Sequence, residues 1–237
     1  MEYLNDLNLE YRTSENMGPG QWLWPKDDYH CWDYFNKDER KRFRYKNISG
    51  YHLPHDIVEL LPIEKKNLVI QAGGNSGLYA SIYSKYFKTV LTFEPDYRWF
   101  CCLAHNARQP NVFKYNAALG NDNIPVSIET PLLHDTENLG GLYVKDNGII
   151  PKLRIDDFGV SPDLIHLDIE GAEWSAIEGA VETIKRSKPI IVVEWDKNSM
   201  TRFGWSIESV NKLFFDLGYA VSKEWKRDKA FTYLESQ

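Results

Sequence analysis

Short runs of β-branched and apolar residues alternate with helical patterns from Leu68 onward, and this alternation limits the folds open to the chain. Such alternation is typical of a parallel sheet with crossover helices rather than of a β-sandwich or a helical bundle. We expect strands over Leu68–Ala72, Thr89–Glu94, Asn111–Asn116, Leu164–Asp168 and Ile190–Trp195.

Apolar residues recur at helical spacing between these runs, so each set can cover one face of the sheet. One stripe comprises Leu78, Ile82, Tyr83 and Tyr86, and the other comprises Trp174, Ile177, Val181 and Ile184. A later helix is expected to begin after Ser206, as its N-cap, and to end at Gly218.

Two more strand-like runs, Tyr219–Lys223 and Ala230–Leu234, follow that helix with a charged turn, Glu224 to Lys229, between them. We expect them to form an antiparallel hairpin. A parallel sheet closed by such a hairpin is the methyltransferase variant of the doubly wound fold. The sequence therefore predicts an α/β protein with a Rossmann-like class I methyltransferase fold, a seven-stranded and mostly parallel sheet with a C-terminal antiparallel hairpin.

The chain has 237 residues, 43% of them hydrophobic, which suffices for one substantial core. We expect a methyltransferase domain over 63–237, preceded over 1–62 by an N-terminal extension or substrate lid that packs over the carboxyl edge of the sheet. The extension carries Trp22, Trp24, Trp32, Tyr34 and Phe35 among many charges. A second, irregular insertion is expected over Gly120–Pro151, which contains Asn138, Gly140 and Gly141.

The formal net charge is −6, and the basic residues cluster only in the short stretch from Lys37 to Lys46. This balance disfavours a nucleic-acid partner. Cys31, Cys101 and Cys102 have no disulfide or zinc spacing, and no run is apolar enough to span a bilayer. We expect a soluble, cytoplasmic protein that acts on a small-molecule or carbohydrate acceptor, with no membrane partner. The sequence does not indicate which oligomeric state the protein adopts.

The first predicted strand ends in a glycine-rich turn that leads straight into a helix. Glycines there let the polar tail of a cofactor approach the backbone and meet a helix N-terminus. A plain strand-to-helix turn is the alternative, because the spacing departs from the dinucleotide fingerprint G-x-G-x-x-G. The cofactor-binding residues expected here are Gln71, Gly73, Gly74, Asn75 and Gly77.

An acidic residue, Glu94, ends the second predicted strand 94 − 73 = 21 positions after Gly73. In doubly wound folds an acidic residue about 20 positions after the first glycine binds the ribose hydroxyls of an adenosine cofactor. We assign that role to Glu94. A solvated loop carboxylate is the alternative.

An acidic cluster follows the fourth predicted strand, in the segment His166-Leu-Asp168-Ile-Glu170-Gly-Ala-Glu173. Glu173 suits the first turn of a helix, which capping alone can explain. Asp168 is costly to bury without a partner, and a sulfonium cofactor or an acceptor hydroxyl would be such a partner. Glu194, at the end of the next strand, adds a carboxylate to the same edge.

These segments together resemble the FkbM-type methyltransferases over about Leu68 to Glu194. The resemblance is carried by Asn75-Ser-Gly77-Leu78-Tyr79, Phe93-Glu94-Pro95, Asn116-Ala117-Ala-Leu-Gly120, Leu167-Asp168-Ile-Glu170-Gly171-Ala-Glu173 and Lys188-Pro189-Ile-Ile-Val-Val-Glu194. It implies a Rossmann-like fold that binds S-adenosyl-L-methionine and O-methyl transfer to carbohydrate, polyketide or similar hydroxyls. It also implies cofactor contacts from Pro95, Ala117 and Asp168.

Two residues depart from the family pattern: Gln71 replaces the usual acidic residue, and His166 stands where Lys is frequent. The amide oxygen of Gln71 can still accept a hydrogen bond from the amino group of the cofactor. His166 is either a core histidine or a catalytic residue.

Methyl transfer from a sulfonium depends mainly on alignment of the reactants. Deprotonation of a hydroxyl acceptor would help, and the candidate proton acceptors are Asp168 and Glu170, with His166 as a third. Alternatively, Asp168, Glu170 and Glu194 would hold a divalent ion that polarises the acceptor. A catalytically degenerate binding module and an NAD-dependent oxidoreductase are the rival functions.

Overall fold

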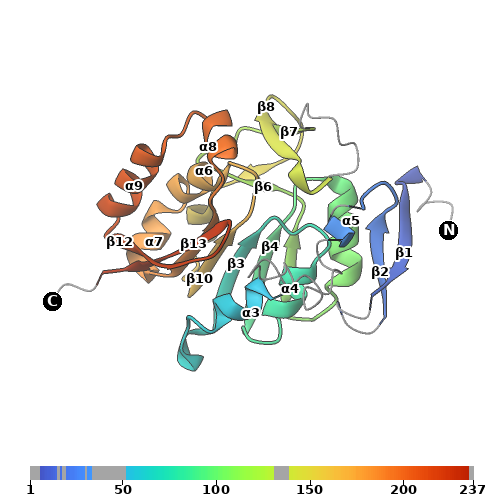
Figure 1. The fold of residues 1–237 in the computed structure, drawn as a ribbon, viewed down its shortest axis with the longest axis horizontal. Helices are drawn as coiled ribbons and strands as arrows, with labels where there is room; N and C mark the ends of the chain where they lie inside the picture. Colours follow the sequence, from blue (N-terminus) through green and yellow to red (C-terminus); the bar gives the residue numbers. More distant parts are fainter. Residues whose placement is uncertain are drawn as a thin grey trace.

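The computed structural model describes residues 6–14, 17, 20–29, 31–33, 52–130 and 139–234. A seven-stranded sheet lies at its centre, in the order β12-β13-β11-β10-β3-β4-β5 (Figure 1). Its strands are β3 (Leu68–Ala72), β4 (Thr89–Phe93), β5 (Val112–Tyr115), β10 (Leu164–Leu167), β11 (Ile190–Glu194), β12 (Tyr219–Glu224) and β13 (Asp228–Tyr233).

The pairing directions confirm the predicted fold class. The five strands from β5 to β11 run parallel, whereas β13 pairs antiparallel with both β11 and β12. Strands β4 and β10 end one residue earlier than expected, so that Glu94 and Asp168 follow their strands. Both carboxylates therefore lie at the carboxyl edge, where open α/β sheets bind ligands.

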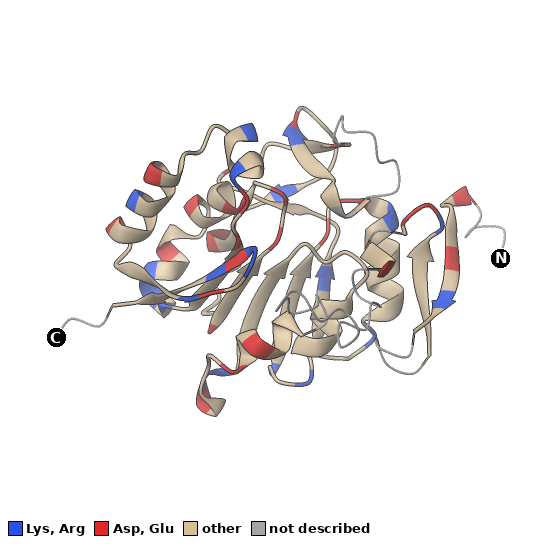
Figure 2. Cartoon of the chain, viewed as in Figure 1, with Lys and Arg blue, Asp and Glu red and all other residues tan. Residues whose placement is uncertain are grey.

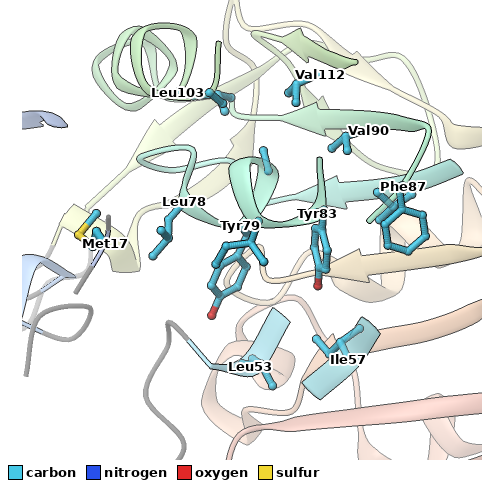
Figure 3. Packing of buried hydrophobic residues seen from close by; sticks show 14 of the residues in the cluster. Met17, Leu53, Ile57, Leu78, Tyr79, Tyr83, Phe87, Val90, Leu103 and Val112 are labelled. Carbon is cyan, nitrogen blue, oxygen red and sulfur yellow. The ribbon is translucent and has the colours of Figure 1, made fainter. Parts of the chain in front are cut away.

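Helices cover both faces of the sheet (Figure 1). One face packs against α3 (Leu53–Val58), α4 (Leu78–Tyr83) and α5 (Tyr97–Asn106), and the other against α6 (Glu173–Glu178), α7 (Val181–Ser187), α8 (Lys197–Arg202) and α9 (Ile207–Asp216). Figure 3 shows Leu53 and Ile57 of α3 facing Tyr79 and Tyr83 of α4. Among the described residues, no helix combines the length and the apolar character needed to cross a membrane.

The predicted apolar stripe from Trp174 to Ile184 does not form one helix. It is divided between α6 and α7, which are separated by Gly179. A Cβ atom at Gly179 would lie 2.0 Å from the carbonyl oxygen of Gly120, so the break lets another segment approach the backbone. The expected helix after Ser206 is confirmed, with Ser206 forming a capping box with Ser209.

Tyr86, the last member of the other predicted stripe, lies outside the core. Helix α4 ends at Tyr83, and the Tyr86 side chain is 40% exposed. Its hydroxyl lies 2.9 Å from Nδ1 of His55. The remaining stripe members, Leu78, Ile82 and Tyr83, are buried as predicted.

The N-terminal extension packs beside α5 as a hairpin of β1 (Leu9–Thr13) and β2 (Gln21–Pro25) (Figure 1). Asn106 of α5 bonds both backbone groups of Leu23, at 2.8 and 3.0 Å. Trp24 is fully buried and meets Trp99 edge-on, with 5.3 Å between ring centroids. The extension therefore shares the apolar core that α4 and α5 build. Tyr34, Phe35 and the Lys37–Lys46 stretch lie outside the described residues.

The insertion between Gly120 and Pro151 is less irregular than predicted. It contains β7 (Val126–Glu129) and β8 (Tyr143–Asp146), which pair antiparallel, and η3 (Leu139–Gly141). Just outside it, β6 (Ala118–Leu119) pairs with β9 (Lys152–Leu153), and η4 (Ile155–Phe158) follows β9. A separate short 3-10 helix, η2 (Ile63–Lys65), precedes β3. Strands of four residues with one buried position, as in β7, or none, as in β8, carry too weak an alternation to be predicted. Asn138 lies outside the described residues.

Candidate active site

A cavity of about 190 Å³ opens at the carboxyl ends of the central parallel strands. Its walls come from the glycine turn after β3, the ends of β4, β10 and β11, the insertion, and the turn between β12 and β13. Eight of the predicted site residues line it: Gly73, Gly74, Asn75, Glu94, Pro95, Ala117, Asp168 and Glu170. The structure therefore brings most of the candidate residues into one place.

The glycine turn passes close to its neighbours at two positions. Gly73 has φ +83°, and a Cβ atom there would lie 2.0 Å from the carbonyl oxygen of Asp168. A Cβ atom at Gly74 would lie 2.7 Å from a methyl carbon of Leu103. The backbone N–H groups of both glycines donate to the carbonyl of Phe93. Glycine is thus required where the turn crosses between two strand ends.

Glu94 is held in place by backbone donors. Its Oε2 accepts the N–H of Asn75 at 2.7 Å, and its Oε1 accepts the N–H of Asp96 at 2.8 Å. The residue is only 6% exposed, and burial raises its pKa to about 8. Each carboxylate oxygen can accept a second hydrogen bond, so the pair remains open to two hydroxyl groups of a ligand.

Two of the predicted cofactor residues do not line the cavity. Gln71 is fully buried, where its Nε2 donates to the Gly73 carbonyl at 2.8 Å and its Oε1 accepts the hydroxyl of Thr92. Gly77 has φ +85° and is the N-cap of α4, and a Cβ atom there would meet Leu103 of α5 at 3.2 Å and Ala107, just after α5, at 3.3 Å. Both residues therefore serve the local fold in this structure.

His166 lies in the core, away from the cavity wall. It is fully buried within β10, stacks on Tyr79, and its Nδ1 lies 2.8 Å from the hydroxyl of Tyr83. Burial lowers its pKa to about 3, so the ring is neutral. The placement matches the core-histidine interpretation, and His166 does not line the cavity.

Three carboxylates meet where β10 and β11 end. One oxygen atom from each of Asp168, Glu170 and Glu194 lies within 4.8 Å of the others. Figure 2 shows acidic segments above the ends of the central strands and charged segments on the neighbouring hairpin. Arg227 forms an ion pair with Glu194 Oε1 at 2.6 Å. Burial and mutual repulsion raise the pKa of Glu170 to about 8 and that of Glu194 to about 10.

Glu173 has a structural role beside this cluster. It is the first residue of α6, and its Oε1 accepts the backbone N–H of Ile169 at 2.8 Å. Burial raises its pKa to about 7, and it does not line the cavity. Glu173 therefore holds the turn between β10 and α6, whereas Asp168 lines the cavity.

Several wall residues were not predicted from the sequence. Arg227 and Asp228 come from the charged turn of the C-terminal hairpin, which carries no motif. Trp99 of α5 faces the cavity and donates from its Nε1 to the Leu139 carbonyl at 3.0 Å, which ties the insertion to α5. Only the folded chain brings these segments to the strand ends.

The sheet order, the glycine turn and the carboxylate at the end of the neighbouring strand define a class I methyltransferase. The profile of the methyltransferase FkbM domain matches residues 71–221, and the chain belongs to this family. The cofactor of the family is S-adenosyl-L-methionine. No curated protein matches the sequence.

Several solved methyltransferase structures are similar to this chain. An FkbM methyltransferase from Methylobacillus flagellatus is 18% identical with a TM-score of 0.48, and the match covers 71% of this chain and 44% of that one. An S-adenosylmethionine-dependent O-methyltransferase from Thermotoga maritima is 12% identical with a TM-score of 0.49, covering 84% and 71%. A magnesium protoporphyrin IX methyltransferase from Synechocystis, with SAH bound, is 10% identical with a TM-score of 0.47, covering 85% and 97%.

Proposed function

We propose that this protein transfers the methyl group of S-adenosylmethionine to a hydroxyl of a sugar or another small molecule. The observation that carries the proposal is the position of Asp168 and Glu170. Their carboxylates line the same cavity as the glycine turn, and the carbonyl of Asp168 lies against Gly73. A proton acceptor therefore lies beside the part of the cavity where the methyl group of the donor would be placed.

The donor half of the cavity comprises Gly73–Asn75, Glu94, Pro95 and Ala117. These residues fit the cofactor because the glycines carry no side chains that would block a polar tail and Glu94 keeps acceptor capacity for two ribose hydroxyls. When bound, S-adenosylmethionine supplies a methyl group on a positively charged sulfur, which is a good leaving group.

The acceptor half comprises Asp168, Glu170, Glu194, Arg227 and Asp228. We assign to Asp168 and Glu170 the orientation of the acceptor hydroxyl and the removal of its proton, because proton transfer raises the nucleophilicity of the oxygen. Cys31 and Leu53 also line the cavity, which supports a role for the 1–62 extension in shaping it.

The direct test supplies purified protein with methyl-labelled S-adenosylmethionine and a panel of matched alcohols, sugars and amines. We expect labelled methyl ethers, identified by mass spectrometry and NMR. Products methylated only on nitrogen would overturn the hydroxyl assignment. Tight binding of S-adenosylhomocysteine without turnover on any acceptor would favour the degenerate binding module instead.

A further inference from the structure

The spacing of the three clustered carboxylates matches the coordination sphere of one cation. Mg²⁺, Mn²⁺ and Ca²⁺ bind oxygen ligands at about 2.0–2.6 Å, so two ligands of one ion lie at most about 5 Å apart. The oxygen atoms of Asp168, Glu170 and Glu194 lie within 4.8 Å of one another. They come from two adjacent strand ends, which fixes their relative positions.

Glu194 provides a second and independent observation. It is 7% exposed, it lines the cavity, and its Oε1 binds Arg227. Its Oε2 is buried and has no hydrogen-bond partner among the residues that the structure describes. A buried carboxylate oxygen without a partner is costly, and a cation in the cavity would satisfy it.

The charges of the acceptor half point the same way. Asp168, Glu170, Glu194 and Asp228 line the cavity, and Arg227 is the one basic side chain among the described residues of its wall. One guanidinium cannot balance four carboxylates, and their repulsion contributes to the raised pKa of Glu170 and Glu194. A divalent ion would remove most of the remaining imbalance.

We propose that Asp168, Glu170 and Glu194 bind a hard divalent cation, and that this cation selects acceptors with two adjacent oxygen atoms. The acceptor part rests on the proposed function. Three protein ligands leave coordination positions for water or for two oxygens of a vicinal diol. As the acceptor oxygen bonds to the methyl carbon, the carbon–sulfur bond breaks, its electron pair neutralises the sulfonium, and the hydroxyl proton passes to a carboxylate oxygen that the cation leaves free.

The cation site is tested with Mn²⁺ by electron paramagnetic resonance on metal-free full-length protein. We expect one saturable site, and we expect Glu194→Gln and Glu170→Gln each to weaken Mn²⁺ binding by about tenfold or more. Glu182→Gln is the matched control, because Glu182 is exposed and forms an ion pair with Lys185 at 3.2 Å, away from the cavity wall. Circular dichroism verifies that every variant is folded. No saturable site in the wild type, or unchanged binding in Glu194→Gln, overturns the proposal.

Calorimetry with S-adenosylhomocysteine on the metal-free protein separates this proposal from the proposed function. If the wild type binds S-adenosylhomocysteine but not Mn²⁺, the cation site alone is wrong. If the wild type does not bind S-adenosylhomocysteine, the proposed function is wrong.

The acceptor class is tested by comparing two probes, cis-1,2-cyclohexanediol and cyclohexanol. We expect the diol, but not cyclohexanol, to displace water from the bound Mn²⁺ and so to reduce the relaxation rate of the water protons. Equal effects of the two probes would overturn the proposal that the cation selects acceptors with adjacent oxygens.

Discussion

The two halves of the cavity hold their carboxylates in opposite ways. In the donor half, Glu94 is fixed by two backbone N–H groups from its own turn and from the glycine turn. In the acceptor half, Asp168, Glu170 and Glu194 lie together with one ion pair from Arg227. Backbone donors create a fixed binding site that does not depend on other side chains. Clustered carboxylates can bind a proton or a cation, as expected of a reactive site.

The largest expected effect comes from Asp168→Asn, which keeps the shape of the side chain and removes its charge. Loss of a general base typically lowers a rate by about 10²–10⁴. We expect the rate of methyl transfer to fall by that factor, while the affinity for S-adenosylhomocysteine measured by calorimetry changes little. An equal loss in rate and affinity would place Asp168 in the donor half.

Gly73→Ala should disturb the contact between the two halves. The added Cβ atom would lie 2.0 Å from the Asp168 carbonyl, at a residue with φ +83°. We expect a loss of about 2 kcal/mol or more in the free energy of unfolding, measured with urea. Gly159→Ala is the control, since Gly159 has φ +62° and nothing within 4 Å of the added atom. A comparable loss in both variants would show that only backbone strain matters at Gly73.

Glu94→Ala should weaken the donor half alone. A hydrogen bond typically contributes about 0.5–1.5 kcal/mol net, so we expect the loss of two bonds to ribose hydroxyls to lower the affinity for S-adenosylhomocysteine by about tenfold. Calorimetry measures the change, and Glu182→Ala provides an exposed control. Unchanged affinity would remove the ribose assignment of Glu94.

The smallest effect concerns pH. The folded protein holds a proton on Glu94 up to a pKa of about 8, against an ordinary value of 4.5, so it binds more protons than the unfolded chain between these limits. The free energy of unfolding should therefore decrease as pH rises from about 4.5 to about 8. Glu94→Gln should reduce this decrease by on the order of 1 kcal/mol, measured by urea unfolding at pH 5 and pH 8. An identical slope in both proteins would contradict the assigned pKa.

The sequence predicted the residues at the strand ends of both halves better than those that other segments bring to the cavity, for a physical reason. Apolar runs mark buried parallel strands, and the residues that follow them must meet at one edge, which placed Glu94 and Asp168 correctly. Gln71 was expected to face the cofactor, but neighbouring strand residues alternate between faces, and its side chain bonds within the sheet. Arg227 and Trp99 escaped prediction because only tertiary packing brings them to the cavity.

The C-terminal hairpin contributes to the cavity from outside the part of the chain that the family profile matches. The match ends at residue 221, whereas Arg227 lies in the turn beyond it and Asp228 begins β13. Strand β13 anchors this turn through its antiparallel pairing with both β11 and β12. Grafting turns of other lengths and charges between β12 and β13 offers a route to redirect acceptor choice without rebuilding the donor half.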